Sequence, residues 1–152
     1  YVAVDDVDAA AKAVKAAGGA IQMEPQDIPN VGRFAFVADP QGALFYLMKS
    51  LSPDRSLAFA WDRPRDGHVA WNELMTTDPA AAWAFYGQHF GWAKDGAMDM
   101  GPMGQYEFIR HNGMIGAIMP KPPQAPVSAW SFYVRVPDID AAATKVRDGD
   151  GT

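Results

Sequence analysis

The sequence predicts an α+β protein built from repeated β-α-β-β-β units. The first observation is an internal repeat, since residues 1–20 and 133–152 are identical at ten of twenty aligned positions. The second is a more distant copy over residues 72–87, which places Asp78 under Asp6 of the first copy. The third is that the complete copy reads as one strand, one helix and then further strands. Together these copies define the repeating unit.

The first unit covers residues 1–49 and is incomplete at its N-terminal strand. Its helix carries an apolar stripe and stops at Gly18-Gly19, because glycine tolerates the backbone conformations of a helix end. Two extended runs then flank the turn at residues 39–42, Asp-Pro-Gln-Gly, whose residue types favour a tight turn. The stripe of this helix is Ala10, Ala13, Val14 and Ala17.

The second unit covers residues 68–119 and is complete. In its opening strand Trp71 and Glu73 share one face, because side chains alternate along a strand. Asp78 is the expected N-cap of the following helix, and Pro79 suits its first position. The pair at residues 112–113, Asn-Gly, lies between two extended runs and predicts a hairpin. The apolar stripe of this helix is Ala82, Phe85, Tyr86, His89 and Phe90.

A third unit begins at residues 131–152 and breaks off inside its helix. Two linkers separate the units: residues 50–67 are mostly polar, and residues 120–130 are proline-rich and favour an extended spacer. A unit that lacks strands leaves an apolar face and unpaired strand edges. We therefore expect either a longer parent chain of about four units or a homodimer that completes the truncated ones.

Composition and charge exclude several classes of partner. The 152 residues are 49% hydrophobic, carry a formal net charge of −5 and include no cysteine. An acidic balance without a basic cluster argues against nucleic acid, and no apolar run approaches the roughly 20 residues of a membrane span. Disulfides and thiolate nucleophiles are excluded. We expect a cytoplasmic protein with a small-molecule ligand and neither a nucleic-acid nor a membrane partner.

Two motifs carry a family resemblance. They are a helix signature of Asp78, Phe85, Tyr86, Phe90, Gly91 and Trp92, and a turn signature of Asp39, Pro40 and Gly42. Both resemble the vicinal-oxygen-chelate superfamily of glyoxalases, bleomycin-resistance proteins and extradiol dioxygenases. In that superfamily, paired units form a cupped, incompletely closed barrel around a small ligand. The resemblance implies mixed sheets curled into cupped half-barrels, with the helices on the outer face.

The positions that would hold a metal ion do not carry metal ligands. Metal-dependent members use a histidine near the start of the first strand of each unit and a Glu or His on its last strand. Aligned through the helix-start aspartates, the first-strand positions are Trp71 and Ser131, and aligned through the turns the last-strand positions are Tyr46 and Ala117. An indole or a methyl group cannot coordinate a divalent ion. We predict no cofactor and disfavour a divalent metal.

The resemblance also places candidate site residues in the cup. Trp71 either stacks on a ligand or fills the core. Glu73 is the catalytic candidate, because a carboxylate in an apolar cup has its neutral form favoured, as a general base does; a salt-bridged structural acid is the alternative. Further ligand-binding candidates follow, each with a structural role as its alternative. These are Tyr46, Ser131, Tyr133 and Arg135, of which Arg135 would suit an anion.

Three functions remain open at this point. The leading one is a glyoxalase-like protein that binds a small organic molecule in a cupped sheet without a metal, and acts as a lyase or isomerase through proton transfer by Glu73. The second is a non-catalytic, resistance-type protein that sequesters its ligand. The third is a divalent-metal-dependent, glyoxalase-like lyase. Whether the protein is an enzyme is left open by the sequence.

Overall fold

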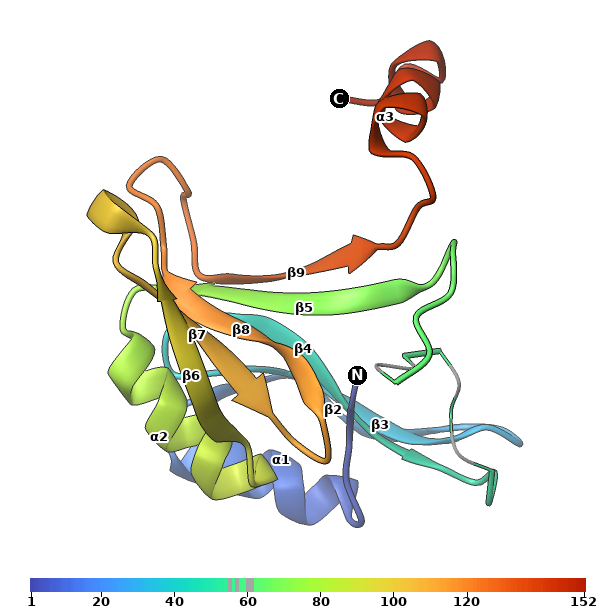
Figure 1. Ribbon diagram of the computed structural model, residues 1–152. Coiled ribbons are helices and arrows are strands. Elements are labelled where there is room, and N and C mark those ends of the chain that lie inside the picture. The colour runs from blue at the N-terminus through green and yellow to red at the C-terminus, as the bar shows by residue number, and fades with distance from the viewer. Residues whose placement is uncertain (55, 57, 60–61) are drawn as a thin grey trace.

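The first β-α-β-β-β unit forms a four-stranded sheet. The computed structural model describes residues 1–54, 56, 58–59 and 62–152 (Figure 1), so part of the linker expected at 50–67 lies outside the described residues. The strand order is β1-β4-β3-β2, with β1 parallel to β4 and the other neighbours antiparallel. The elements are β1 (Val2–Ala3), α1 (Val7–Ala16), β2 (Ala20–Ile28), β3 (Gly32–Ala38) and β4 (Leu44–Ser50).

The second unit forms a five-stranded sheet, because the first strand of the third unit joins it. The order is β6-β7-β8-β5-β9, in which β5 is parallel to β8 and antiparallel to β9. The elements are β5 (Val69–Thr76), α2 (Pro79–Phe90), β6 (Ala93–Asp99), the short 3-10 helix η1 (Gly101–Met103), β7 (Gln105–Arg110), β8 (Met114–Pro120), β9 (Ala129–Val134) and α3 (Ile139–Asp148).

The predicted fold class is confirmed. The protein is α+β, the two units share one topology with a parallel pair formed by their first and last strands, and both sheets are mixed. Helices α1 and α2 pack on the sheets and against each other, whereas α3 stands apart beyond β9 (Figure 1). The sheets differ from the expected half-barrels, because both are open. The first sheet has β1 and β2 as its edge strands, and the second has β6 and β9.

An aspartate begins each of the three helices. The side chains of Asp6, Asp78 and Asp138 accept a hydrogen bond from the backbone N–H three residues later, at 2.9, 3.0 and 2.9 Å. These bonds satisfy amide groups that have no partner inside a helix, which explains why the aspartate recurs in every copy. Helix α2 ends at Gly91, whose φ of 67° suits a residue without a side chain. No helix in the described ranges has the length and apolarity needed to cross a membrane.

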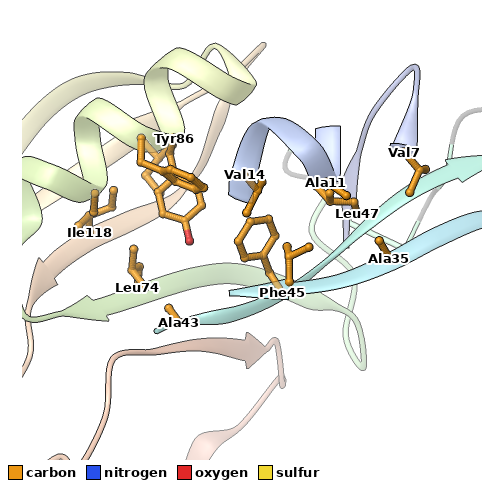
Figure 2. Close-up of a cluster of buried hydrophobic side chains, with 14 residues drawn as sticks. Val7, Ala11, Val14, Ala35, Ala43, Phe45, Leu47, Leu74, Tyr86 and Ile118 are labelled. Atoms are coloured by element: carbon orange, nitrogen blue, oxygen red, sulfur yellow. The ribbon is translucent and has the colours of Figure 1, made fainter. Parts of the chain in front are cut away.

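One hydrophobic core joins the first and second units (Figure 2). Val7 and Val14 of α1 are buried over the first sheet, where Leu47 of β4 is also fully buried. Phe45 of β4 reaches the second unit and makes an edge-to-face contact with Phe85 of α2, with ring centroids 6.5 Å apart. Because these side chains exclude water from both units at once, the first and second sheets are stabilised together.

A buried hydrogen-bond chain links all three units. The Trp130 indole of β9 donates to the Tyr86 hydroxyl of α2 at 2.9 Å, and that hydroxyl donates to Asp39 Oδ2 at 3.0 Å. Asp39 Oδ1 accepts from the backbone N–H groups of Gln41 at 2.9 Å and Ala43 at 2.8 Å, which fixes the turn between β3 and β4. Since Asp39 is only 2% exposed, every one of these bonds compensates for its lost hydration.

Asp39 is expected to make the stability of the protein depend on pH. Burial raises the pKa of Asp39 above its ordinary value of 3.8, against the lowering effect of its hydrogen bonds. At pH values between the ordinary pKa of 3.8 and the raised pKa of the folded state, Asp39 is protonated in the folded protein and ionised in the unfolded chain. The free energy of unfolding therefore falls as the pH rises through this interval. Urea titrations of the wild type and Asp39→Asn at several pH values measure this. An identical pH slope in both proteins would contradict the assignment.

The third helix lacks the contacts that bury the first. Ile139 and Val146 of α3 are 71% and 50% exposed, whereas Val7 and Val14, which occupy the same positions of α1, are each 1% exposed. The apolar stripe of α1 is covered by three strands of its own unit. We infer that the stripe of α3 packs on a comparable three-stranded surface from another copy or another part of a parent chain.

Association of this 152-residue chain should depend on the α3 stripe. We expect the chain to form dimers or larger species in multi-angle light scattering, because exposed apolar side chains of this size gain about 25 cal/mol per Å² when they are buried. Ile139→Asp should reduce association while the circular dichroism of the fold is retained. Thr144→Asp is the matched control, because Thr144 lies on the other side of α3. A wild-type chain that stays monomeric at all concentrations would refute packing of the α3 stripe on another copy.

Candidate functional site

One face of the second sheet carries most of the predicted site residues. In the register of β5 and β9, Trp71 lies opposite Tyr133, and Glu73 lies opposite Ser131. On the other side of β5, Glu73 lies opposite Ala117 of β8. Because successive side chains of a strand point to opposite faces, these residues share one face of the sheet. The residues between them on β5 and β8, such as Leu74 and Ile118, point into the core under α2.

A hydrogen-bond chain organises this face around Glu73. The Trp71 indole Nε1–H donates to the Tyr106 hydroxyl at 2.7 Å, and the Tyr106 hydroxyl donates to Glu73 Oε2 at 2.8 Å. The ring of Phe108, two residues along β7, makes edge-to-face contacts with both aromatic partners of this chain, at 6.2 and 5.9 Å. Glu73 itself is 8% exposed. The result is one carboxylate held in an aromatic environment by a phenol that an indole orients.

Both tyrosines beside Glu73 remain protonated donors. Burial is the main cause that raises the pKa of Tyr106 above its ordinary value, and its hydrogen bond to the Glu73 carboxylate raises it further. Burial likewise raises the pKa of Tyr133, and the Glu73 carboxylate raises it further. Tyr133 lies opposite Trp71 in the register, so it places a second phenol on this face, where its hydroxyl can donate to a ligand oxygen.

Two candidates lie away from Glu73. Tyr46 is on β4 of the first sheet, where it stacks between Tyr1 and Phe36 at centroid distances of 4.7 and 4.5 Å. Arg135 follows the end of β9, and its guanidinium pairs with Asp66 at 3.2 Å and donates to the Pro64 carbonyl at 2.7 Å. The structure therefore places the Arg135 side chain against the segment that precedes β5, away from Glu73.

Tyr106 and Phe108 belong to this face but are missing from the sequence-based candidates. The hairpin at Asn112-Gly113 is the feature of the sequence that could have indicated them. It sets the register of β7 on β8, in which Phe108 lies opposite Ala117, and every second residue of β7 then falls on the face of Ala117. The contact between Tyr106 and Glu73 spans 33 positions of sequence and depends on the strand order, which no local pattern encodes.

The donor set at this face does not fit a bound divalent metal. Of the four positions implied by the resemblance, Trp71 and Ala117 offer no coordinating atom, Ser131 offers a neutral hydroxyl, and Tyr46 lies in the other sheet. Within the described residues, no group of three or more His, Cys, Asp or Glu side chains is placed to hold an ion. The residues around Glu73 are therefore suited to acid–base and hydrogen-bond chemistry.

The fold and this face define a class of protein: repeated β-α-β-β-β units that present a carboxylate and aromatic side chains on the sheet face away from the helices. Residues 1–47 match the family model described as Glyoxalase/Bleomycin resistance protein/Dioxygenase superfamily. The first unit of the chain is thus similar to members of this superfamily.

Relatives from two groups of bacteria match almost the whole chain. The Mycobacterium tuberculosis protein CFP32, provisionally named a glyoxylase, is 32% identical over 152 residues, covering 99% of this chain and 56% of the relative. The Streptomyces peucetius anthracycline biosynthesis protein DnrV is 31% identical over 163 residues, and the alignment covers 100% of this chain and 54% of DnrV. A crystal structure of glyoxalase I from Zea mays aligns with 87% of this chain, and the alignment covers 41% of the glyoxalase chain. The sequence identity is 19% and the TM-score is 0.31. The chain spans about half the length of the relatives it matches.

Proposed function

We propose that this protein binds a small, uncharged organic molecule on the face around Glu73 and acts on it as a metal-independent lyase or isomerase. The observation that carries the proposal is the chain of hydrogen bonds from Trp71 through Tyr106 to the Glu73 carboxylate. An uncharged ligand is favoured because this face presents a carboxylate, while Arg135, the nearest predicted cation, is paired with Asp66.

The proposed chemistry is proton transfer. Glu73 removes a proton from a carbon next to a carbonyl group, and the electron pair of the broken C–H bond moves onto the carbonyl oxygen. The hydroxyl of Tyr133 or Tyr106 donates a hydrogen bond to this oxyanion, which stabilises it in the transition state. In an α-hydroxy ketone, return of the proton to the former carbonyl carbon while the α-hydroxyl loses its own proton gives the isomer. Where the carbon β to the carbonyl bears a leaving group, expulsion of that group with its bonding electron pair gives the lyase product.

The shape of the ligand follows from the side chains around the carboxylate. Trp71, Tyr106 and Phe108 meet at steep angles to one another, so they can enclose the edges and the face of a flat molecule. Relatives named for glyoxylase activity and for anthracycline biosynthesis are consistent with a carbonyl compound and with an aromatic one. We therefore favour an aromatic ketone.

The second candidate is ligand sequestration without turnover. It is favoured by the same aromatic side chains, which need no acid or base to bind a flat molecule. The metal-dependent lyase is the third, and the donor set argues against it. Calorimetry before and after treatment with EDTA, together with elemental analysis, separates the third from the first two. Loss of binding and of one equivalent of metal together would establish the third.

Replacing Trp71 by alanine tests the proposed binding face. We expect the affinity for 1,8-dihydroxyanthraquinone, measured by calorimetry, to fall at least tenfold, because the variant loses the aromatic wall and the donor that orients Tyr106. The melting temperature should fall by less than expected for a buried tryptophan, whose loss costs about 3–5 kcal/mol. Trp83→Ala is the matched control, since Trp83 donates to Glu107 on the helix side of the sheet. Equal affinities of both variants would rule out this face.

A further inference from the structure

A hollow lies away from the Glu73 face, between the two packed helices. Its volume is about 620 Å³, and it is bounded by the C-terminal half of α1, the exposed side of α2 and the Asp39 turn. This volume is in the range of small-molecule sites. Five of its ten lining residues are alanines, whose small side chains let a ligand approach the helix backbone closely. The lining residues that matter here are Ala13, Ala84, Phe85, Gln41 and His89.

Two buried polar atoms of this hollow have no hydrogen-bond partner among the described residues. They are Oε1 of Gln41 and Nε2 of His89, from the turn after β3 and from the last turn of α2. The His89 ring packs against the ring of Phe85, with centroids 4.9 Å apart. Buried polar groups in folded proteins are nearly always paired, so each such atom calls for a partner. Both residues line the same hollow, although they lie 48 positions apart in the sequence.

We propose that the hollow between α1 and α2 is a second binding site, which takes a small aromatic molecule bearing a hydroxyl group. A phenol offers a donor for the Gln41 oxygen and an acceptor for an imidazole N–H of His89. Its ring lies between the alanines and Phe85, where apolar area is removed from water. A purely apolar ligand, or a helix that presents only apolar side chains, would leave both polar atoms without partners.

The site does not involve Glu73. The hollow is lined by α1, α2 and the Asp39 turn, while Glu73 lies on the sheet face that points away from α2. A ligand in the hollow contacts the first and second units together, so it stabilises the arrangement of the two units. This site and the proposed catalytic face can therefore be tested independently.

The test uses 6-bromo-2-naphthol as the probe and 2-bromonaphthalene as its counterpart without a hydroxyl. In crystals of the full chain soaked with the naphthol, we expect the anomalous bromine signal between α1 and α2, with the hydroxyl at Gln41 and His89. In solution, calorimetry should give an affinity at least tenfold higher for the naphthol than for the bromonaphthalene.

Variants separate a ligand-binding role of His89 from a structural one. His89→Leu should lower the affinity for the naphthol at least tenfold without lowering the melting temperature, because it removes a buried atom that has no partner. His111→Leu is the matched control, since His111 is exposed at the β7–β8 turn. Ala84→Phe fills the hollow and should abolish binding. A bromine signal only at the Trp71 face, water alone between Gln41 and His89, or unchanged affinity in His89→Leu would overturn the proposal.

Discussion

Replacing Tyr86 by alanine is expected to lower the free energy of unfolding by about 3–5 kcal/mol, as for other large buried aromatic side chains. The Tyr86 side chain is fully buried, stacks on Trp92 at 4.9 Å and packs edge-on against Trp130 at 5.5 Å. The substitution removes these contacts and leaves Asp39 and the Trp130 indole without their hydrogen-bond partner. Urea denaturation followed by tryptophan fluorescence measures the change.

Tyr86→Phe separates packing from hydrogen bonding. This variant keeps the ring but leaves the Asp39 carboxylate and the Trp130 N–H unsatisfied, so we expect a loss of about 1–3 kcal/mol. The Tyr86 hydroxyl keeps its proton and stays a hydrogen-bond donor, because burial and then the Asp39 carboxylate raise the pKa of Tyr86. If Tyr86→Phe were as stable as the wild type, the chain between the three units would contribute nothing to stability.

Replacing Glu73 by glutamine is expected to slow proton transfer by about 10²- to 10⁴-fold, the usual contribution of a general base. The variant keeps the size of the side chain and its hydrogen bond from Tyr106, so ligand binding should change far less than turnover. The measurement is the exchange of the carbon-bound protons of 2-hydroxyacetophenone with deuterium from the solvent, followed by NMR. The proposed lyase or isomerase activity requires this exchange in the wild type.

Glu107→Gln is the matched control for Glu73→Gln. Glu107 is also a carboxylate of the second sheet, but it accepts hydrogen bonds from Trp83 and Lys94 on the helix side. We expect Glu107→Gln to catalyse the exchange of the ketone protons at the rate of the wild type. Wild-type binding of the ketone with no exchange in any of the three proteins would favour sequestration over catalysis.

Local chemistry explains why much of the fold could be predicted from the sequence. The caps at Asp6 and Asp78 and the stop at Gly91 act within one helical turn, so each is visible in a short window. Alternation along β5 placed Trp71 and Glu73 on one face for the same reason. The repeat then extended these local predictions to the topology of every unit.

Contacts between distant segments could not be predicted in this way. The pairing of Tyr106 with Glu73 requires the strand order of β7, β8 and β5, and the chain from Trp130 to Asp39 requires the packing of three units. The ion pair of Arg135 with Asp66 joins segments 69 positions apart, so no local pattern indicated it. Tyr46 was assigned to the same site because the resemblance aligns units without saying which sheet each occupies.

The antiparallel pairing of β5 with β9 has a consequence for symmetry. The helix caps Asp78 and Asp138 place equivalent residues 60 positions apart, so Tyr133 is the counterpart of Glu73. The register, with Trp71 opposite Tyr133 and Glu73 opposite Ser131, relates the two strands by a local twofold axis between them. Two glutamates facing each other across this axis would repel, and one would stay protonated. Because one strand carries glutamate and the other tyrosine, the two equivalent positions hold one carboxylate and one phenol, and the two sides of the axis differ in charge and in hydrogen-bonding character.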